Sequence, residues 1–252
     1  MLKKNNNKGW LKSFLVFPLI FIPQIFALTI LTLLGFDLSS FTTAKIDLTT
    51  MVFFEYIMIF FMVIILYFCM KYIDKEKFAS IGLDFNGRFI EFNFGIFLGF
   101  IIMAFAFSTL ILFGEIVFEK VIIDFNKIMM LIILFVGVSF FEEVVFRGYI
   151  LKNLMQSFNP FVSLFISSIL FCLIHSSNPN VNYLGLINIF LAGYFLGISY
   201  VYTKNLWFPF ALHFSWNFFQ SMFGFNVSGL DSYSMIDFTI PKNNFFNGGE
   251  FG

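Results

Sequence analysis

The feature that most constrains this chain is a series of apolar runs, each about 20 residues long. A helix rises about 1.5 Å per residue, so a run of that length covers the ~30 Å of hydrocarbon in a bilayer. Of the 252 residues, 59% are hydrophobic and only 12% are charged, against roughly 25% charged in an ordinary soluble domain. A soluble core cannot absorb so much apolar surface. The sequence therefore predicts an all-α protein that crosses a membrane several times.

The apolar runs predict about seven transmembrane helices. They are expected at about 11–35, 51–73, 92–114, 128–152, 160–176, 183–203 and 206–224. The first run is too long for the apolar part of a signal peptide, and no small-x-small cleavage pattern follows it. We expect residues 1–91 to form an N-terminal transmembrane hairpin with a cytoplasmic loop, 92–224 a catalytic membrane core, and 225–252 a polar tail.

The basic residues are distributed unevenly between the two sides of the predicted helices. The formal net charge is zero, so nothing indicates a nucleic-acid partner. Ten basic residues fall on the side of the N-terminus: Lys3, Lys4, Lys8, Lys12, Lys71, Lys75, Lys77, Arg88, Lys152 and Lys204. The other side receives four: Lys45, Lys120, Lys127 and Lys242. Because cytoplasmic loops carry the excess of Lys and Arg, this asymmetry predicts a cytoplasmic N-terminus.

The fourth predicted helix carries three charged residues in an apolar setting: Glu142, Glu143 and Arg147. Uncompensated, they would cost roughly 8–10 kcal/mol near the centre of a bilayer. Glu143 and Arg147 are four apart on one helical face, in the favourable order for an ion pair. Glu142 is rotated about 100° away and has no local partner, so it needs polar groups from other helices.

Both histidines of the chain lie in predicted membrane helices, and they are the natural partners of Glu142. His175 ends the fifth helix, while His213 and Asn217 share a face of the seventh. Since buried ionisable residues in a membrane normally gather in one cavity, we expect these four side chains to converge. Helix rises put His213 at ~10 Å, Glu142 at ~15 Å and His175 at ~22 Å from the cytoplasmic ends, so tilted helices must absorb the difference.

Such a cluster suits two chemistries, and the residues alone do not choose between them. In one, Glu142 deprotonates a water for attack on an amide carbonyl. One of the two histidines, His175 or His213, and Asn217 stabilise the oxyanion, and a histidine protonates the leaving nitrogen. In the other, Glu142, His175 and His213 bind Zn²⁺ with an open position for water. A thiol mechanism through Cys172 is disfavoured, because no feature activates that thiol.

Three blocks on separate predicted helices resemble the CPBP family of CAAX proteases and bacteriocin-processing, Abi-type enzymes. They are Glu-Glu-x-x-x-Arg at 142–147, Phe-x-x-x-His at 171–175 and His-x-x-x-Asn at 213–217. The resemblance extends over about 128–224. The Ser-Ile-Gly-Leu stretch at 80–83 and the helix with Gly95 and Gly99 also look like the region before the core in that family.

The resemblance implies an intramembrane endopeptidase, glutamic or metal-dependent, that hydrolyses a peptide bond of a membrane-associated or lipidated peptide or protein. Glu142 would act as the base on water, with His175, His213 and Asn217 lining the site. Glu143, Arg147 and Phe171 would support it. No cofactor is expected on the glutamate mechanism, and zinc is the alternative. Family members often continue with another helix after a Gly-Gly-x-Phe-Gly stretch like that at 248–252, which would be an eighth span.

The composition and the family also suggest where the protein works and what else it could be. A chain rich in Phe, Ile, Lys and Asn is typical of an AT-rich bacterial genome, so we expect an integral protein of a bacterial cell membrane. The expected partners are the bilayer and a peptide or protein substrate, and nothing indicates an oligomeric state. A non-catalytic membrane partner or bacteriocin-immunity protein, which would keep the polar cluster for folding, is the competing interpretation.

Overall fold

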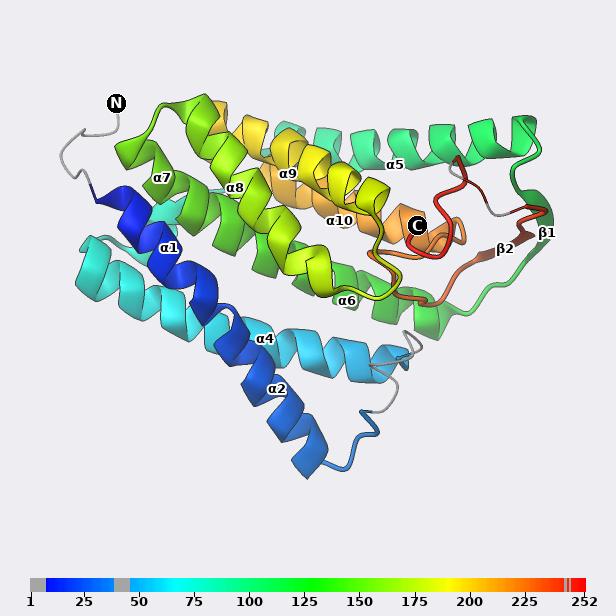
Figure 1. Cartoon of the computed structure of the whole chain (residues 1–252), viewed down its shortest axis with the longest axis horizontal. Coiled ribbons are helices and arrows are strands. Elements are labelled where there is room, and N and C mark those ends of the chain that lie inside the picture. The colour runs from blue at the N-terminus through cyan, green and yellow to red at the C-terminus, as the bar shows by residue number, and fades with distance from the viewer. Residues whose placement is uncertain (1–7, 39–45, 243, 245) are drawn as a thin grey trace.

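The protein is a bundle of long helices that cross one another obliquely, shown as a computed structural model in Figure 1. The structure describes residues 8–38, 46–242, 244 and 246–252. Lys3, Lys4 and Lys45, which support the predicted orientation, lie outside these residues.

The helices follow the predicted runs closely. In chain order the α-helices are α1 (Gly9–Leu19), α2 (Phe21–Leu33), α4 (Leu48–Phe68), α5 (Phe89–Leu112), α6 (Phe125–Glu143), α7 (Lys152–Ser157), α8 (Pro160–Ile174), α9 (Tyr183–Thr203) and α10 (Trp207–Met222). Two π-helical stretches, η1 (Cys69–Asp74) and η3 (Val144–Leu151), continue α4 and α6. Two 3₁₀ turns, η2 (Phe78–Ile81) and η4 (His175–Ser177), are the other helical elements of the described residues.

Six helical stretches of the described chain are long and apolar enough to cross a membrane. They are Gly9–Leu33, Leu48–Asp74, Phe89–Leu112, Phe125–Ser157, Pro160–Ser177 and Tyr183–Thr203. The seventh predicted span corresponds to α10, which has only 16 residues and is shorter than the expected 206–224. Its start is fixed by Asn205, whose side chain accepts a hydrogen bond from the Trp207 amide, and it ends before Gly224, which has a φ of +98°.

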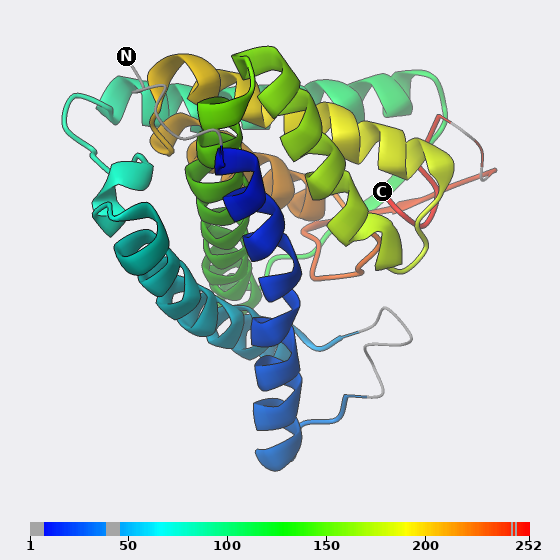
Figure 2. The ribbon, with the colours of Figure 1, turned by 60° about the vertical axis from the view of Figure 1, so that its left-hand side comes forward.

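The first two helices run as one long rod against the rest of the bundle (Figure 2). α2 packs against α4, α4 packs against α6, and α1 packs against α7. The start of α8 is also as the sequence predicts, because Asn159 caps it ahead of Pro160 and accepts hydrogen bonds from the amides of Phe161 and Val162.

Helix α10 lies directly against α5 because α5 presents two glycines there. A Cβ atom on Gly95 would lie 2.9 Å from the Cβ of Ala211, and one on Gly99 would lie against the Ser215 side chain and 2.8 Å from the Trp216 amide nitrogen. The Ser215 hydroxyl donates to the Ile96 carbonyl across this contact. Small residues of this kind let helix backbones approach closely inside a membrane.

The loop between η1 and α5 also fixes the start of α10. The carbonyl of Gly82 accepts a hydrogen bond from the Leu206 amide, and the Leu83 carbonyl accepts one from the Trp207 indole. Glu76 of this loop binds Lys152. Burial alone would raise the pKa of Glu76, but the hydrogen bond and charge of Lys152 lower it overall, so the carboxylate stays ionised at neutral pH.

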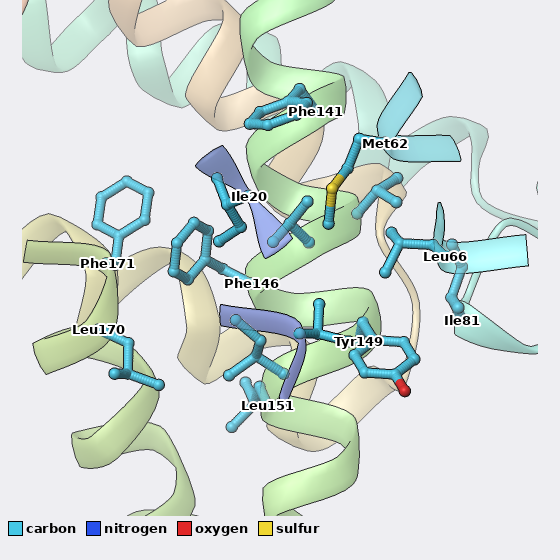
Figure 3. Close-up of a cluster of buried hydrophobic side chains, with 14 of the residues drawn as sticks. Ile20, Met62, Leu66, Ile81, Phe141, Phe146, Tyr149, Leu151, Leu170 and Phe171 are labelled. Atoms are coloured by element: carbon cyan, nitrogen blue, oxygen red, sulfur yellow. The ribbon is translucent and has the colours of Figure 1, made fainter. Parts of the chain in front are cut away.

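The main hydrophobic core surrounds the end of α6 and the π-helical stretch η3. Figure 3 shows Phe141, Phe146 and Tyr149 in its centre, with Met62 of α4 on one side and Phe171 of α8 on the other. The residues just after Glu143 are thus sealed on all sides by apolar side chains. This packing holds the charged part of the helix in a fixed rotation.

The end of the bundle opposite the 75–88 loop is covered by a small two-stranded sheet and the polar tail. β1 (Val117–Val121) pairs antiparallel with β2 (Ile236–Thr239). Phe251 of the tail is buried and its ring fills the space that a side chain on Gly185 would occupy. The tail therefore packs onto the start of α9. The pairing of β2 with β1 joins it to the segment between α5 and α6.

Candidate active site

The charged residues of the fourth predicted helix lie at the junction of α6 and η3. Glu142 and Glu143 are the last two residues of α6, and Arg147 lies within the π-helical stretch that follows. Short π-helical stretches are rare and occur frequently at functional sites. Glu143 and Arg147 are almost completely buried, and the Glu142 side chain is 13% exposed.

Glu143 and Arg147 form the predicted ion pair. Nη1 of Arg147 lies 2.8 Å from Oε1 of Glu143, and Nη2 donates to the carbonyl of Gly193 on α9. The guanidinium also lies over the ring of Phe171, 4.7 Å from its centroid. These contacts compensate the buried charge of Arg147 and join α6 to α8 and α9.

Glu143 has a second partner that its spacing in the sequence does not reveal. Its Oε1 lies 2.8 Å from Nδ1 of His213 on α10. Oε1 of Glu143 already accepts a hydrogen bond from Arg147, and a carboxylate oxygen accepts here as well, so Nδ1 of His213 carries the hydrogen. This bond fixes the ring and leaves Nε2 available on its far side.

His175 is held in the same way by a backbone group. It follows α8 directly, and its Nδ1 lies 2.8 Å from the carbonyl oxygen of Phe171, one turn earlier. A carbonyl can only accept, so Nδ1 of His175 carries the hydrogen and Nε2 is again the available nitrogen. Phe171 thus contacts Arg147 through its ring and His175 through its carbonyl, which agrees with the supporting position expected for it.

The two available nitrogens both face Glu142. Nε2 of His175 lies 3.6 Å from Oε1 of Glu142, and Nε2 of His213 lies 3.7 Å from Oε2. Both separations are longer than a hydrogen bond. A single atom about 2.8 Å from the imidazole nitrogen and from the carboxylate oxygen could contact the two groups at once. The difference in depth that simple helix rises gave for these three residues is therefore absorbed by the oblique crossing of the helices (Figure 1).

Asn217 lies on the same helix as His213, one turn later, and is largely buried. Within the described residues, no hydrogen bond or ion pair joins it to Glu142 or to either histidine. Its expected position beside the site follows from the four-residue spacing on α10. The role of Asn217 in lining the site and contacting a substrate stays a prediction.

The residue types of a zinc site are present in this arrangement, because Glu142, His175 and His213 are the types that bind zinc with one open position. Among the residues that the structure describes, no group of three or more His, Cys, Asp or Glu side chains is placed to hold a metal ion. The zinc alternative stays a prediction.

The structure also packs one acidic residue that the sequence reasoning missed against Gly137 of α6, the helix that carries Glu142. Glu55 lies in the middle of the apolar run of α4 and is 9% exposed. A charge inside a predicted membrane helix is itself a signal for a functional position, and this signal could have been read from the sequence.

Residues 124–219 match the sequence model of the Rce1-like family, described as type II CAAX prenyl endopeptidase Rce1-like. Over this segment the chain is similar to that family. No curated protein and no solved structure matches this chain.

The Rce1-like segment, residues 124–219, contains every residue of the predicted site: Glu142, Glu143, Arg147, Phe171, His175, His213 and Asn217. It runs from the start of α6 almost to the end of α10 and so includes all the helices that carry these side chains. The match supports the resemblance of this segment to CPBP-family CAAX proteases, and the described chain has six helical stretches long and apolar enough to cross a membrane.

Proposed function

We propose that this protein is an intramembrane endopeptidase in which Glu142 activates water to hydrolyse a peptide bond of a membrane-associated or lipidated peptide. The observation that carries the proposal is the placement of two imidazole Nε2 atoms beside the two oxygens of one buried carboxylate. Both Nδ1 atoms are bound elsewhere, so both available nitrogens are directed at one position.

The first step is attack of water on the scissile carbonyl. Glu142 takes one proton from the water, the water oxygen forms a bond to the carbonyl carbon, and the π electron pair moves to the carbonyl oxygen. The resulting oxyanion accepts hydrogen bonds from a protonated imidazole and from the Asn217 amide. An apolar surrounding strengthens each of these interactions, because little water is present to screen them.

The second step breaks the bond between carbon and nitrogen. The electron pair on the oxyanion re-forms the C=O bond as the C–N bond breaks. The electron pair of the C–N bond stays on the nitrogen, which takes a proton from the protonated histidine, and Glu142 gives that histidine the proton it took from water. The products are a carboxylic acid and an amine, and the site returns to its starting state. His213 keeps its orientation throughout because Glu143 and Arg147 hold its Nδ1 side.

The substrate class follows from where the site lies and from the family. Glu142 is enclosed by helices that are apolar enough to cross a membrane, so a substrate must reach it from the bilayer or its surface. The matched family is described as a type II CAAX prenyl endopeptidase, and we propose a substrate that is anchored in the membrane by a lipid or an apolar segment.

Comparative peptidomics tests this function even while the substrate is unidentified. Cells that carry the wild-type protein and cells that carry Glu142→Ala would be compared, with protein amounts matched. The proposal expects membrane-derived peptides that depend on Glu142. A non-catalytic immunity or scaffold protein would instead give identical peptide profiles while keeping its phenotype in the Glu142→Ala strain.

A further inference from the structure

Glu55 is a buried acid that the chemistry above does not use. It lies seven residues after the start of α4, in a stretch whose neighbours are almost all apolar. Its Oε1 is shielded from solvent and has no hydrogen-bond partner in the described part of the chain. A charged side chain at such a position costs about 2.5–3.5 kcal/mol, so Glu55 must be neutral or must be compensated.

The side chain of Glu55 is directed at α6, the helix that carries Glu142. A Cβ atom on Gly137 would lie 3.0 Å from Cγ of Glu55, so the glycine makes room for this side chain against the α6 backbone. Gly137 precedes Glu142 by five residues, which is about 7.5 Å along the helix. Two charges at about this separation still repel one another where little water screens them.

The other groups around Glu55 offer no compensating charge. On α6, Glu143 is already bound to Arg147 and His213. On α2, which packs against the other side of α4, there is no titratable residue. Next to Glu55, Tyr56 donates its hydroxyl to the Ile133 carbonyl. Lys127 of α6 lies ten residues before Gly137, about 15 Å along the helix. Among the described charged residues of α6, this leaves Glu142 for Glu55.

We propose that Glu55 is the proton-carrying partner of Glu142, so that the two carboxyl groups hold one proton between them, located on Glu55. Two carboxylates that share an apolar site do not both ionise, because the second charge is repelled by the first. Glu142 faces two imidazoles and becomes the ionised member, whereas Glu55 faces no cation. Glu55 then acts through Glu142 as a positioning residue. This inference rests on the proposed role of Glu142 as the ionised base.

Infrared spectroscopy of the purified protein in lipid measures this proton directly. The C=O stretching band of a protonated carboxylic acid would be followed over a pH titration in the wild type and in Glu55→Gln. We expect the wild type to show a band at neutral pH that Glu55→Gln lacks. Persistence of the whole band in Glu55→Gln would overturn the proposal.

The coupling is tested in Glu142→Gln, in which Glu55 is intact. Removal of the neighbouring negative charge makes Glu55 easier to ionise, so the band should disappear at a pH lower by about one unit or more than in the wild type. An unchanged midpoint would contradict the coupling. Tyr56→Phe, on the same turn of α4, is the matched control and should change neither the band nor its midpoint.

These infrared measurements do not depend on turnover, so their failure is separate from a failure of the proposed function. If Glu142→Gln kept full peptidase activity, the role of Glu142 as base would be wrong even though the coupled pair was observed. If Glu142→Gln lost activity but left the Glu55 band unchanged, the peptidase proposal would stand and the coupled pair would be wrong.

Discussion

Glu143 stabilises two buried side chains with a single oxygen. Its Oε1 accepts from Arg147 on its own helix and from His213 on α10. The ion pair was predicted because a four-residue spacing puts both side chains on one helical face. The bond to His213 could not be predicted, because it joins residues 70 positions apart and depends on how α10 is rotated against α6.

We predict that Glu143→Gln destabilises the folded protein by about 3–5 kcal/mol, because it leaves the Arg147 guanidinium buried without a counter-charge. The midpoint of thermal unfolding in detergent would measure the loss. The control is Asp237→Asn, which removes the exposed pair with Lys120 and should cost no more than about 1 kcal/mol. Equal effects of the two variants would show that the buried pair does not stabilise the fold.

The glutamate mechanism also makes a prediction about metal. We expect the purified protein to keep its peptidase activity after treatment with a chelator and dialysis, because in the proposed mechanism Glu142 itself takes the proton from water. Elemental analysis of the same sample would measure bound zinc. Loss of activity on chelation, with recovery on adding zinc, would contradict the mechanism and would make Glu142, His175 and His213 metal ligands.

At the scale of the elements, the apolar runs predicted the helices well because in lipid each helix must satisfy its own backbone. Helix α9 spans the predicted 183–203, and Asn159 and Pro160 start α8 as their types predict. The shortness of α10, the π-helical stretch and the pairing of β1 with β2 were not predicted. These features depend on contacts between distant segments, which apolar periodicity does not encode.

The contact between α5 and α10 gives a prediction at this scale. Gly99→Ala places a methyl group against Ser215 and the Trp216 backbone, and we expect it to destabilise the protein by about 1–3 kcal/mol. It should also lower activity by displacing His213. Ser108→Thr adds one methyl group at an exposed position of the same helix and should change neither property. Thermal unfolding and turnover would be measured together, and wild-type values for Gly99→Ala would show that the glycine contact is not required.

At the scale of the molecule, the oblique crossing of the helices brings Glu142, His175 and His213 together. If the helices ran straight across the membrane, the rise of about 1.5 Å per residue would put these side chains at different depths. The convergence of Glu142, His175 and His213 could be predicted because isolated charges are costly in lipid. The relative depths could not be predicted, since they depend on tilts that only packing sets. The same cost argument applies to Glu55, because its carboxyl group lies inside the apolar run of α4.

The orientation of the bundle in the membrane is a prediction from the lysine asymmetry. In a cysteine-free background with Cys69 and Cys172 replaced, Lys77→Cys and Glu119→Cys place thiols at two exposed positions at opposite ends of α5. An impermeant thiol reagent should label Glu119→Cys in intact cells, and Lys77→Cys only after the cells are opened. The reverse pattern would place the N-terminus outside.

The measurement that tests the central claim most directly is the turnover of Glu142→Gln on a membrane-reconstituted substrate peptide found by peptidomics. Glutamine keeps the size and the hydrogen-bonding oxygen of Glu142 but cannot take the proton from water. We predict that turnover falls by about 10²–10⁴-fold, while the thermal unfolding midpoint stays near that of the wild type. Glu119→Gln, on the exposed strand β1, should cleave at the wild-type rate. Undiminished turnover in a well-folded Glu142→Gln protein would contradict the account.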